Sequence, residues 1–268
     1  MSLPRGRTVP LSRGRRFVLD VMHFAQGVPL VTVERDVDVS AVAAARSAAE
    51  PKPGWVPIFV KAFARAAVVV PDLRRSLLTV PWTRLHEHAC SVACLTVERE
   101  VDGEQQVFVI QIRQPEDAPL ADIAEQIRKA KTAPVREVAA FRRNLLLLGF
   151  PRPLRRLGWW LALRVFPRWR MKYIGTFVVS SVASLGAGTT AALTPLTTYF
   201  TFDPVRPDGT VRLRLMFDHR VTDAGPAARA LAEMERALNS AILTELRGMV
   251  SRTPPPTPPR SGEGRKPF

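Results

Sequence analysis

Residues 211–231 read V-R-L-R-L-M-F-D-H-R-V-T-D-A-G-P-A-A-R-A-L, and the two periodicities that decide the fold meet within them. Apolar side chains alternate from Val211 to Phe217, which predicts a buried strand. Small and apolar residues follow at helical spacing, which predicts a helix from Pro226 to about Arg247. Side chains at the end of a buried strand can face a cleft, so the polar turn between them is the first candidate site.

The same two periodicities run through the rest of the chain. Alternation predicts strands over residues 31–39, 84–101, 106–113, 174–182 and 197–203. Helical spacing predicts helices over 12–26, after Ser40, and over 57–70 and 117–147. Hairpin-linked strands with segregated helices predict an α/β two-layer sandwich, with helices on one face of a mixed sheet, and not a Rossmann alternation.

Composition describes an ordinary globular chain. It has 268 residues, 46% of them hydrophobic and 24% charged, with a mean hydropathy of zero, so one domain or at most two is expected. The only cysteines, Cys90 and Cys94, are too few for a disulfide framework and predict a reducing, cytoplasmic compartment. Arg or Pro interrupts every apolar run before the ~18 to 20 residues that a membrane span needs, so no span is expected.

The net charge of +15 is concentrated in three segments. Residues 1–16 carry +5, residues 142–172 carry +9 without any acid, and residues 251–268 carry +3, which leaves the remainder slightly negative. We therefore predict no nucleic-acid partner. The expected organisation is a basic flexible arm over 1–11, a catalytic domain over 12–250 with a basic amphipathic insertion at 142–172, and a Pro-rich disordered tail over 251–268.

The turn after Phe217 carries the residue types of acid–base chemistry. An imidazole can accept a proton near neutral pH, and a fixed hydrogen bond to one ring nitrogen leaves the other free, so His219 is a candidate general base. Asp223 lies four residues later. From spacing alone, the alternative is that His219 fills a turn and Asp223 only begins a helix.

The turn resembles a family signature. D-H-R-V-T-D-A-G is similar to the D-H-R-x-x-D-G motif of dihydrolipoamide acyltransferase catalytic domains, which belong to the chloramphenicol acetyltransferase-like superfamily. Residues 175–181, G-T-F-V-V-S-S, resemble that family's G-T-F-T-I-S-[NS] strand. Further similar segments are the arginine helix at 15–18, the strand at 31–39, the apolar helix at 57–71 and the acidic helix at 120–127, so the resemblance spans about 12–247.

This resemblance implies the CoA-dependent acyltransferase fold and acyl transfer between coenzyme A and a thiol such as dihydrolipoamide, without a metal. It implies His219 as the base, Ser180 as the oxyanion donor, and Asp223 as a structural partner salt-bridged to an arginine of the first helix, with Arg16 the candidate. It also implies a homotrimer whose site lies between subunits.

Departures from the family pattern leave alternatives open. Ala224 stands where the family has glycine, so a left-handed backbone there would cost about 1 kcal/mol, or the turn must shift. Ser181 or Ser184 could replace Ser180. No lipoyl or subunit-binding domain precedes the body, so any lipoyl carrier is expected on another chain. The rival function is a noncatalytic trimeric scaffold that docks to a membrane surface or a partner complex.

Two other segments have weaker signals. Residues 142–172 place Leu154, Leu157, Leu161 and Val165 at helical spacing among arginines and tryptophans, which favours either a stripe packed on the body or a neighbouring subunit, or a peripheral membrane contact. We favour packing. On one strand face, His86, His88, Cys90 and Cys94 would stand ~6.6 Å apart in succession, so no metal site is predicted.

Overall fold

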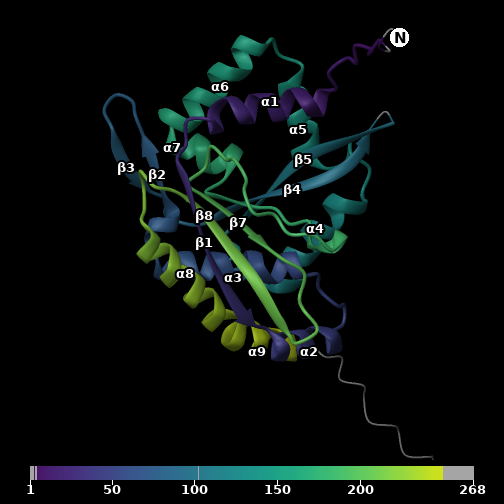
Figure 1. Ribbon diagram of the computed structural model, residues 1–268, viewed down its shortest axis with the longest axis vertical. Coiled ribbons are helices and arrows are strands. Elements are labelled where there is room, and N and C mark those ends of the chain that lie inside the picture. Colours follow the sequence, from purple (N-terminus) through teal and green to yellow (C-terminus); the bar gives the residue numbers. More distant parts are fainter. Residues whose placement is uncertain (1–2, 4, 102, 250–268) are drawn as a thin grey trace, which may run out of the picture.

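The structure is a computed structural model and describes residues 3, 5–101 and 103–249. A mixed six-stranded sheet lies at its centre in the order β1-β8-β7-β6-β4-β5 (Figure 1). Its strands are β1 (Leu30–Asp38), β4 (Val92–Val101), β5 (Glu104–Arg113), β6 (Phe177–Val179), β7 (Thr198–Phe202) and β8 (Thr210–Asp218). The short β6 is parallel to both of its neighbours, β4 and β7, whereas the other pairs are antiparallel.

One face of the sheet carries the main core. It is covered by α2 (Ser40–Ala48), α3 (Trp55–Val69), α4 (Leu120–Thr132), α8 (Ala224–Ala237) and α9 (Leu243–Gly248). Alternate residues of β8, from Val211 to Phe217, are fully buried against these helices. Phe63 of α3 stacks on Phe177 of β6, with 4.4 Å between ring centroids. Burial of each such side chain stabilises the folded state by about 1.5–3 kcal/mol, so this apolar layer holds the helices on the sheet.

The opposite face is only partly covered. Helices α1 (Arg13–Ala25) and α6 (Arg152–Arg164) lie over one end of it, where Phe24 and Trp159 join a smaller core around Leu163 and Val178. Helix α5 (Ala139–Leu148) packs on the edge strand β5. The remaining elements are the hairpin β2 (Arg75–Leu78) and β3 (Arg84–Glu87), α7 (Pro167–Trp169), and short 3-10 or π segments at Pro71–Arg74, Arg170–Ile174, Ala183–Leu185 and Leu238–Ile242.

The predicted α/β sandwich with a mixed sheet is confirmed, and so is the helix start at Ser12, whose hydroxyl accepts a hydrogen bond from Arg15 N. Three boundaries differ. The predicted helix over 117–147 breaks into α4 and α5, because Pro134 follows Ala133, which is extended. The predicted strand over 84–101 divides into β3 and β4, and the one over 174–182 shortens to β6. The predicted tail, 251–268, lies outside the described residues.

Glycine 175 explains the late start of β6. Its φ of +123° is open to glycine and strained for other residues, and an added Cβ would lie 2.9 Å from the Val92 carbonyl oxygen. The chain therefore turns at Gly175 before it can pair with β4. Within the described ranges, no helix is long and apolar enough to cross a membrane.

Candidate active site

His219 lies just beyond the end of β8, in the turn that leads into α8. Its Nδ1 is 3.2 Å from Oδ1 of Asp223, and its side chain is half exposed. Nδ1 donates a hydrogen bond to a carboxylate in this arrangement, which fixes the imidazole tautomer and leaves Nε2 with a free lone pair. The structure thus pairs His219 with Asp223, a contact that sequence reasoning did not predict, and Nε2 is the atom that can accept a proton.

Asp218 and Arg220 hold the backbone on either side of His219. The Asp218 carboxylate accepts hydrogen bonds from Nε and NH2 of Arg220 at 2.9 and 2.8 Å, and from Arg220 N at 3.0 Å. Arg220 NH1 also donates to the Gly27 carbonyl oxygen, which ties this turn to the end of α1. The pairing raises the pKa of Arg220. These contacts fix the direction in which His219 leaves the strand.

A second arginine approaches Asp218 from the basic insertion. Arg170 is 4% exposed, and its NH2 donates to Thr197 Oγ1 at 3.3 Å. Burial lowers its pKa to about 10, and the negative charge of Asp218 acts in the opposite direction. Arg170 therefore stays charged at neutral pH and faces the carboxylate next to the candidate base. The cavity lined by Arg170, Asp218 and Arg220 has a volume of only ≈ 10 Å³, too small for a substrate.

Ser180 directly follows β6 and faces the less covered side of the sheet. Its Oγ accepts a hydrogen bond from Thr96 Oγ1 at 2.7 Å. A hydroxyl has one proton to donate, and the partners of Ser180 are themselves hydroxyls, those of Thr96 and Tyr199, which can rotate so that the Ser180 proton points to an outside acceptor. Tyr199 is the third hydroxyl here: burial raises its pKa, and its hydrogen bond with Ser180 partly offsets that rise.

The structure separates Ser180 from the serine next to it. Ser181 Oγ donates its proton to the Phe202 carbonyl oxygen at 2.9 Å and accepts from Ala183 N at 3.1 Å. Its single donor is therefore already used within the fold. Ser184 lies exposed in the following 3-10 turn. Of the three serines that the sequence left open, Ser180 has a defined position on the sheet and only rotatable hydroxyls as hydrogen-bond partners.

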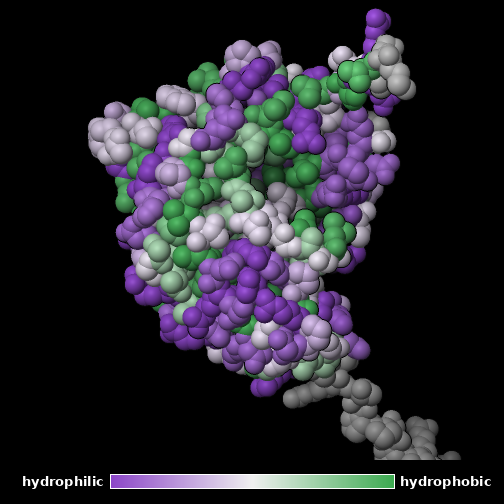
Figure 2. Space-filling view, viewed as in Figure 1, coloured by the Kyte–Doolittle hydropathy of each residue, from purple (hydrophilic) through white to green (hydrophobic). Residues whose placement is uncertain are grey.

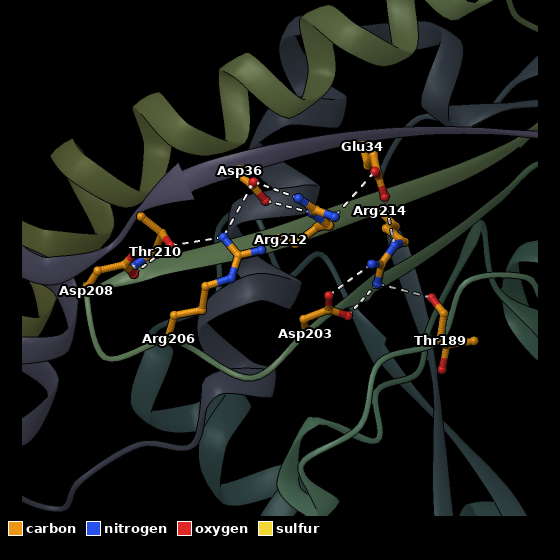
Figure 3. A network of polar contacts seen from close by, with 9 residues as sticks. All are labelled: Glu34, Asp36, Thr189, Asp203, Arg206, Asp208, Thr210, Arg212 and Arg214. Atoms are coloured by element: carbon orange, nitrogen blue, oxygen red, sulfur yellow. Dashed lines mark hydrogen bonds and ion pairs between the residues drawn. The ribbon is translucent and has the colours of Figure 1, made fainter.

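An ion-pair network holds the loop that follows Ser180 (Figure 3). Arg214 of β8 donates to Glu34 of β1 at 2.9 Å and makes two hydrogen bonds with Asp203. Its NH1 also donates to the Thr189 carbonyl oxygen at 3.5 Å. Gly188 passes so close that a Cβ there would be 2.0 Å from an Asp203 carboxylate oxygen. The loop is thus fastened to the same face as Ser180.

The network continues along β1 and β8 toward the other end of the strands. Arg212 makes two hydrogen bonds with Asp36, at 2.8 and 2.9 Å, and Arg206 lies 3.5 Å from the same carboxylate. The hydrogen bond from Arg212 is the main reason that the pKa of Asp36 falls to about 2. The outer face of these two strands is consequently polar and charged, unlike the apolar face beneath it.

Ser180 and His219 do not meet within one chain. The sheet register aligns Val179 with Phe200, and Thr201 with Arg214, so Ser180 lies level with Arg214. His219 lies five residues farther along the β8 direction and two strands across, which corresponds to about 20 Å between the backbones. A site that uses both residues needs two copies of the chain.

The other predicted residues fall in different places. Arg16 is exposed on α1 and lines a groove with Asp20 and Phe150, and within the described residues no ion pair joins it to Asp223. The predicted contact between Arg16 and Asp223 therefore stays a prediction for an assembly. Ala224 is the first residue of α8 and is not left-handed, because Gln114 is the only described non-glycine residue with positive φ. The alanine adds no backbone strain.

The histidines and cysteines of β3 and β4 are structural. His88 is buried, and its Nε2 lies 3.1 Å from Ser76 Oγ. Burial, with the charge of Arg170, lowers the pKa of His88 to about 3. Cys94 is buried in the smaller core, and its pKa rises to about 12 for the same reason. No three His, Cys, Asp or Glu side chains are placed to hold a metal ion in the described part of the chain.

Sequence reasoning missed the polar residues that position this site. Arg220 lies in the turn after β8 and folds back on Asp218, a pairing that strand alternation does not predict. Thr96 and Tyr199 reach Ser180 from neighbouring strands, and only the register reveals them. Arg170 comes from the basic insertion, and the surrounding sequence gives no sign that this arginine is buried.

Comparison with known proteins identifies the fold. No protein-family model and no curated protein matches the chain by sequence. Among solved structures, a probable dihydrolipoamide acetyltransferase from Listeria monocytogenes matches 93% of this chain and 97% of its own, with a TM-score of 0.62 and 17% identity. Dihydrolipoamide acetyltransferase from Azotobacter vinelandii matches 90% and 94%, with a TM-score of 0.65 and 19% identity.

A third structure extends the likeness to an archaeal complex. The truncated catalytic core of the 2-oxoacid dehydrogenase complex from Thermoplasma acidophilum matches 88% of this chain and 99% of its own, with a TM-score of 0.63 and 16% identity. At these identities the likeness shows a shared fold. The chain thus has the fold of dihydrolipoamide acetyltransferase cores, as its sequence motifs predicted.

Proposed function

We propose that this protein is an acyltransferase that moves an acyl group between coenzyme A and a thiol such as dihydrolipoamide. The observation that carries the proposal is the His219 imidazole, whose Nδ1 is held by Asp223 while Nε2 is free, in a fold shared with dihydrolipoamide acetyltransferases. In the Azotobacter protein, a serine, a histidine and an asparagine were investigated for their catalytic roles, and the last two are four residues apart. His219 and Asp223 have the same spacing.

The proposed reaction needs one proton acceptor and one oxyanion donor. His219 Nε2 takes the proton of the acceptor thiol as its sulfur attacks the thioester carbonyl carbon. A carbon–sulfur bond forms, and the carbonyl oxygen becomes negative. The Ser180 hydroxyl stabilises that oxygen by donating a hydrogen bond to it. When the intermediate collapses, the bond to the CoA sulfur breaks, and the leaving thiolate takes the proton back from His219. Both thiols enter as substrates, and the enzyme is restored.

The proposal requires a site built between subunits. Ser180 lies level with the middle of β8 and His219 lies beyond its end, about 20 Å away in the same chain, so a neighbour must supply one of them. A cyclic assembly joins two different patches through one repeated interface, and the homotrimer that the sequence resemblance implies is the simplest such ring. We propose this trimer, with a pantetheine channel between its subunits and a lipoyl carrier on another chain.

We also propose a cytoplasmic location. Both cysteines are free thiols, and Cys94 is buried, so the fold works without a disulfide. A reducing compartment suits this chemistry, because a dithiol acceptor must stay reduced to attack a thioester.

The test is a transfer assay with the full-length protein. Acetyl-CoA and longer acyl-CoAs are mixed with dihydrolipoamide, and the loss of CoA thioester is followed for the wild type and for His219→Ala. We expect the variant to lose about 10³-fold in kcat. His23→Ala, another exposed histidine, on α1, is the matched control and should keep wild-type rates. Equal rates for wild type and His219→Ala, or no transfer by either, would favour the noncatalytic scaffold instead.

A further inference from the structure

The basic segment, residues 142–172, presents apolar side chains outward. Leu146 is 72% exposed, Leu154 55% and Leu157 51%, and Leu147, Phe150 and Trp160 are also exposed around the turn from α5 to α6. The first half of this stripe does not pack on the body of its own chain, because α6 docks through Trp159, Ala162 and Leu163 instead, and its packing on a neighbouring subunit stays a prediction. An exposed row of large apolar residues on a helix marks a surface that binds a protein or a membrane.

The charges of the same segment are largely unpaired. Nine Lys and Arg residues occur in it without an acid, and the only acid that pairs with them in the described chain is Asp20 of α1, which takes Arg155 and Arg156. Arg152 and Arg168 are exposed and have no ion-pair partner in the part of the chain that the structure describes. The segment therefore combines apolar surface with uncompensated positive charge.

A groove lies where this segment meets α1. It has a volume of ≈ 500 Å³, with Leu19, Leu148 and Phe150 among its walls and Arg16 and Arg152 beside them. α1 and α6 lie together at one end of the molecule, and that end shows hydrophobic and hydrophilic residues side by side (Figures 1 and 2). Apolar walls beside arginines suit an acyl chain with an anionic headgroup.

We propose that the basic segment docks this protein on a membrane surface that contains anionic phospholipid. Leucine and tryptophan side chains would enter the interface, and the arginines would meet headgroup phosphates. Two copies of this protein cannot dock on each other through this same segment, because the positive charges of the two segments would repel each other. The proposal goes beyond acyl transfer and does not depend on it.

The primary experiment is sedimentation of the full-length protein with vesicles. One set is pure phosphatidylcholine, and the other contains about 30% phosphatidylglycerol. We expect binding to the anionic vesicles only, with loss of binding as salt rises from 50 to 500 mM. Equal binding to both vesicle types, or none to either, would overturn the proposal.

Paired variants separate the apolar contribution from the charge. Leu154→Asp with Leu157→Asp should weaken binding at least 10-fold, whereas Val68→Asp with Val69→Asp, equally exposed on α3, should not. Arg152→Gln with Arg168→Gln should weaken binding about 30-fold, and Lys131→Gln with Arg136→Gln should have little effect.

Two results of the variant series would contradict a membrane role. If the leucine variants bind anionic vesicles as tightly as the wild type, the apolar side chains do not enter the membrane, and binding to vesicles is only a nonspecific attraction between charges. If they instead reduce the oligomer size measured by light scattering while vesicles are never bound, the apolar row is an interface between copies. Normal circular dichroism and an unchanged unfolding midpoint confirm that the exposed substitutions leave the fold intact.

Discussion

Ser180 and His219 lie about 20 Å apart in one chain, with Ser180 level with the middle of β8 and His219 beyond its end, although each has the local environment of a working group. Ser180 has hydroxyl partners, Thr96 and Tyr199, that fix the position of its oxygen; His219 has a fixed tautomer and a free Nε2. Both are accessible at the molecular surface. The arrangement is that of two half-sites, each completed by another copy of the chain.

The choice between Ser180 and Ser181 gives the first prediction. Ser181 donates its only proton to the backbone carbonyl oxygen of Phe202, whereas the partners of Ser180 are hydroxyls that can rotate away. Ser180→Ala should therefore lower kcat about 10² to 10³-fold with little change in KM, because it removes an interaction made to the oxyanion. Ser181→Ala should change kcat less than about 5-fold and lower thermal stability instead. The opposite order in kcat would move the oxyanion donor to Ser181.

Asp223 should act on the rate through His219. Asp223→Leu removes the acceptor at Nδ1 and should lower kcat about 10-fold or more, while Asp223→Asn keeps an amide oxygen that can accept from Nδ1–H and should retain most of the rate. If Arg16 of a neighbouring copy holds Asp223, Arg16→Met should lower kcat as well, and the double variant should lose no more than Asp223→Leu alone. If the double variant instead lost kcat by the product of the two single losses, Arg16 would act independently of Asp223.

Arg170 links the basic segment to the turn that carries His219, because the charges of Arg170 and Asp218 act on each other without a direct ion pair. Arg170→Met leaves Asp218 with Arg220 as its one cation and should lower the free energy of unfolding by about 1–3 kcal/mol. Asp218→Asn should also destabilise. A double-mutant cycle measured by urea unfolding should give a coupling of about 1 kcal/mol or more. Strict additivity would show that the two charges do not interact.

His88 predicts a pH dependence of stability. Its pKa in the folded protein is about 3, against an ordinary value of 6.5, so between these values the unfolded chain binds a proton that the folded chain does not. Its contribution is fully present above about pH 6.5 and is lost as the pH falls, by up to about 1.4 kcal/mol per pH unit. His88→Gln removes this titration, so its unfolding free energy should fall less steeply from pH 6 to 4. Parallel curves for the two proteins would contradict the assignment.

Much of the fold was predictable because the local signals agree. Val211, Leu213, Leu215 and Phe217 recur at alternate positions and are fully buried, Ser12 caps the first helix, and the motif around His219 marks a strand end. The sequence could not show the two parallel pairings of β6, since a three-residue strand between long loops has no register of its own. Parallel order is set by tertiary packing, not by local pattern.

The site was predictable in its residues but not in its surroundings. His219, Asp223 and Ser180 were found from a motif, whereas Thr96, Tyr199 and Arg170 were not, because they approach from other strands or from the insertion. The basic segment also shows why periodicity is ambiguous. Leu154 and Leu157 have the spacing of a packed stripe, yet the bulky Trp159 and Leu163 occupy the docking face and leave them in solvent.

The central claim is that one subunit supplies His219 and its neighbour supplies Ser180, and mixed assemblies test it directly. His219→Ala and Ser180→Ala should each keep at most about 1% of the wild-type activity when made alone, and the two are then coexpressed with different tags and purified as hybrids. In a random mixture, about a quarter of the interfaces join a wild-type histidine to a wild-type serine, so about a quarter of the wild-type activity should return. Hybrids no more active than the two parent variants would show that the residues do not act together across subunits.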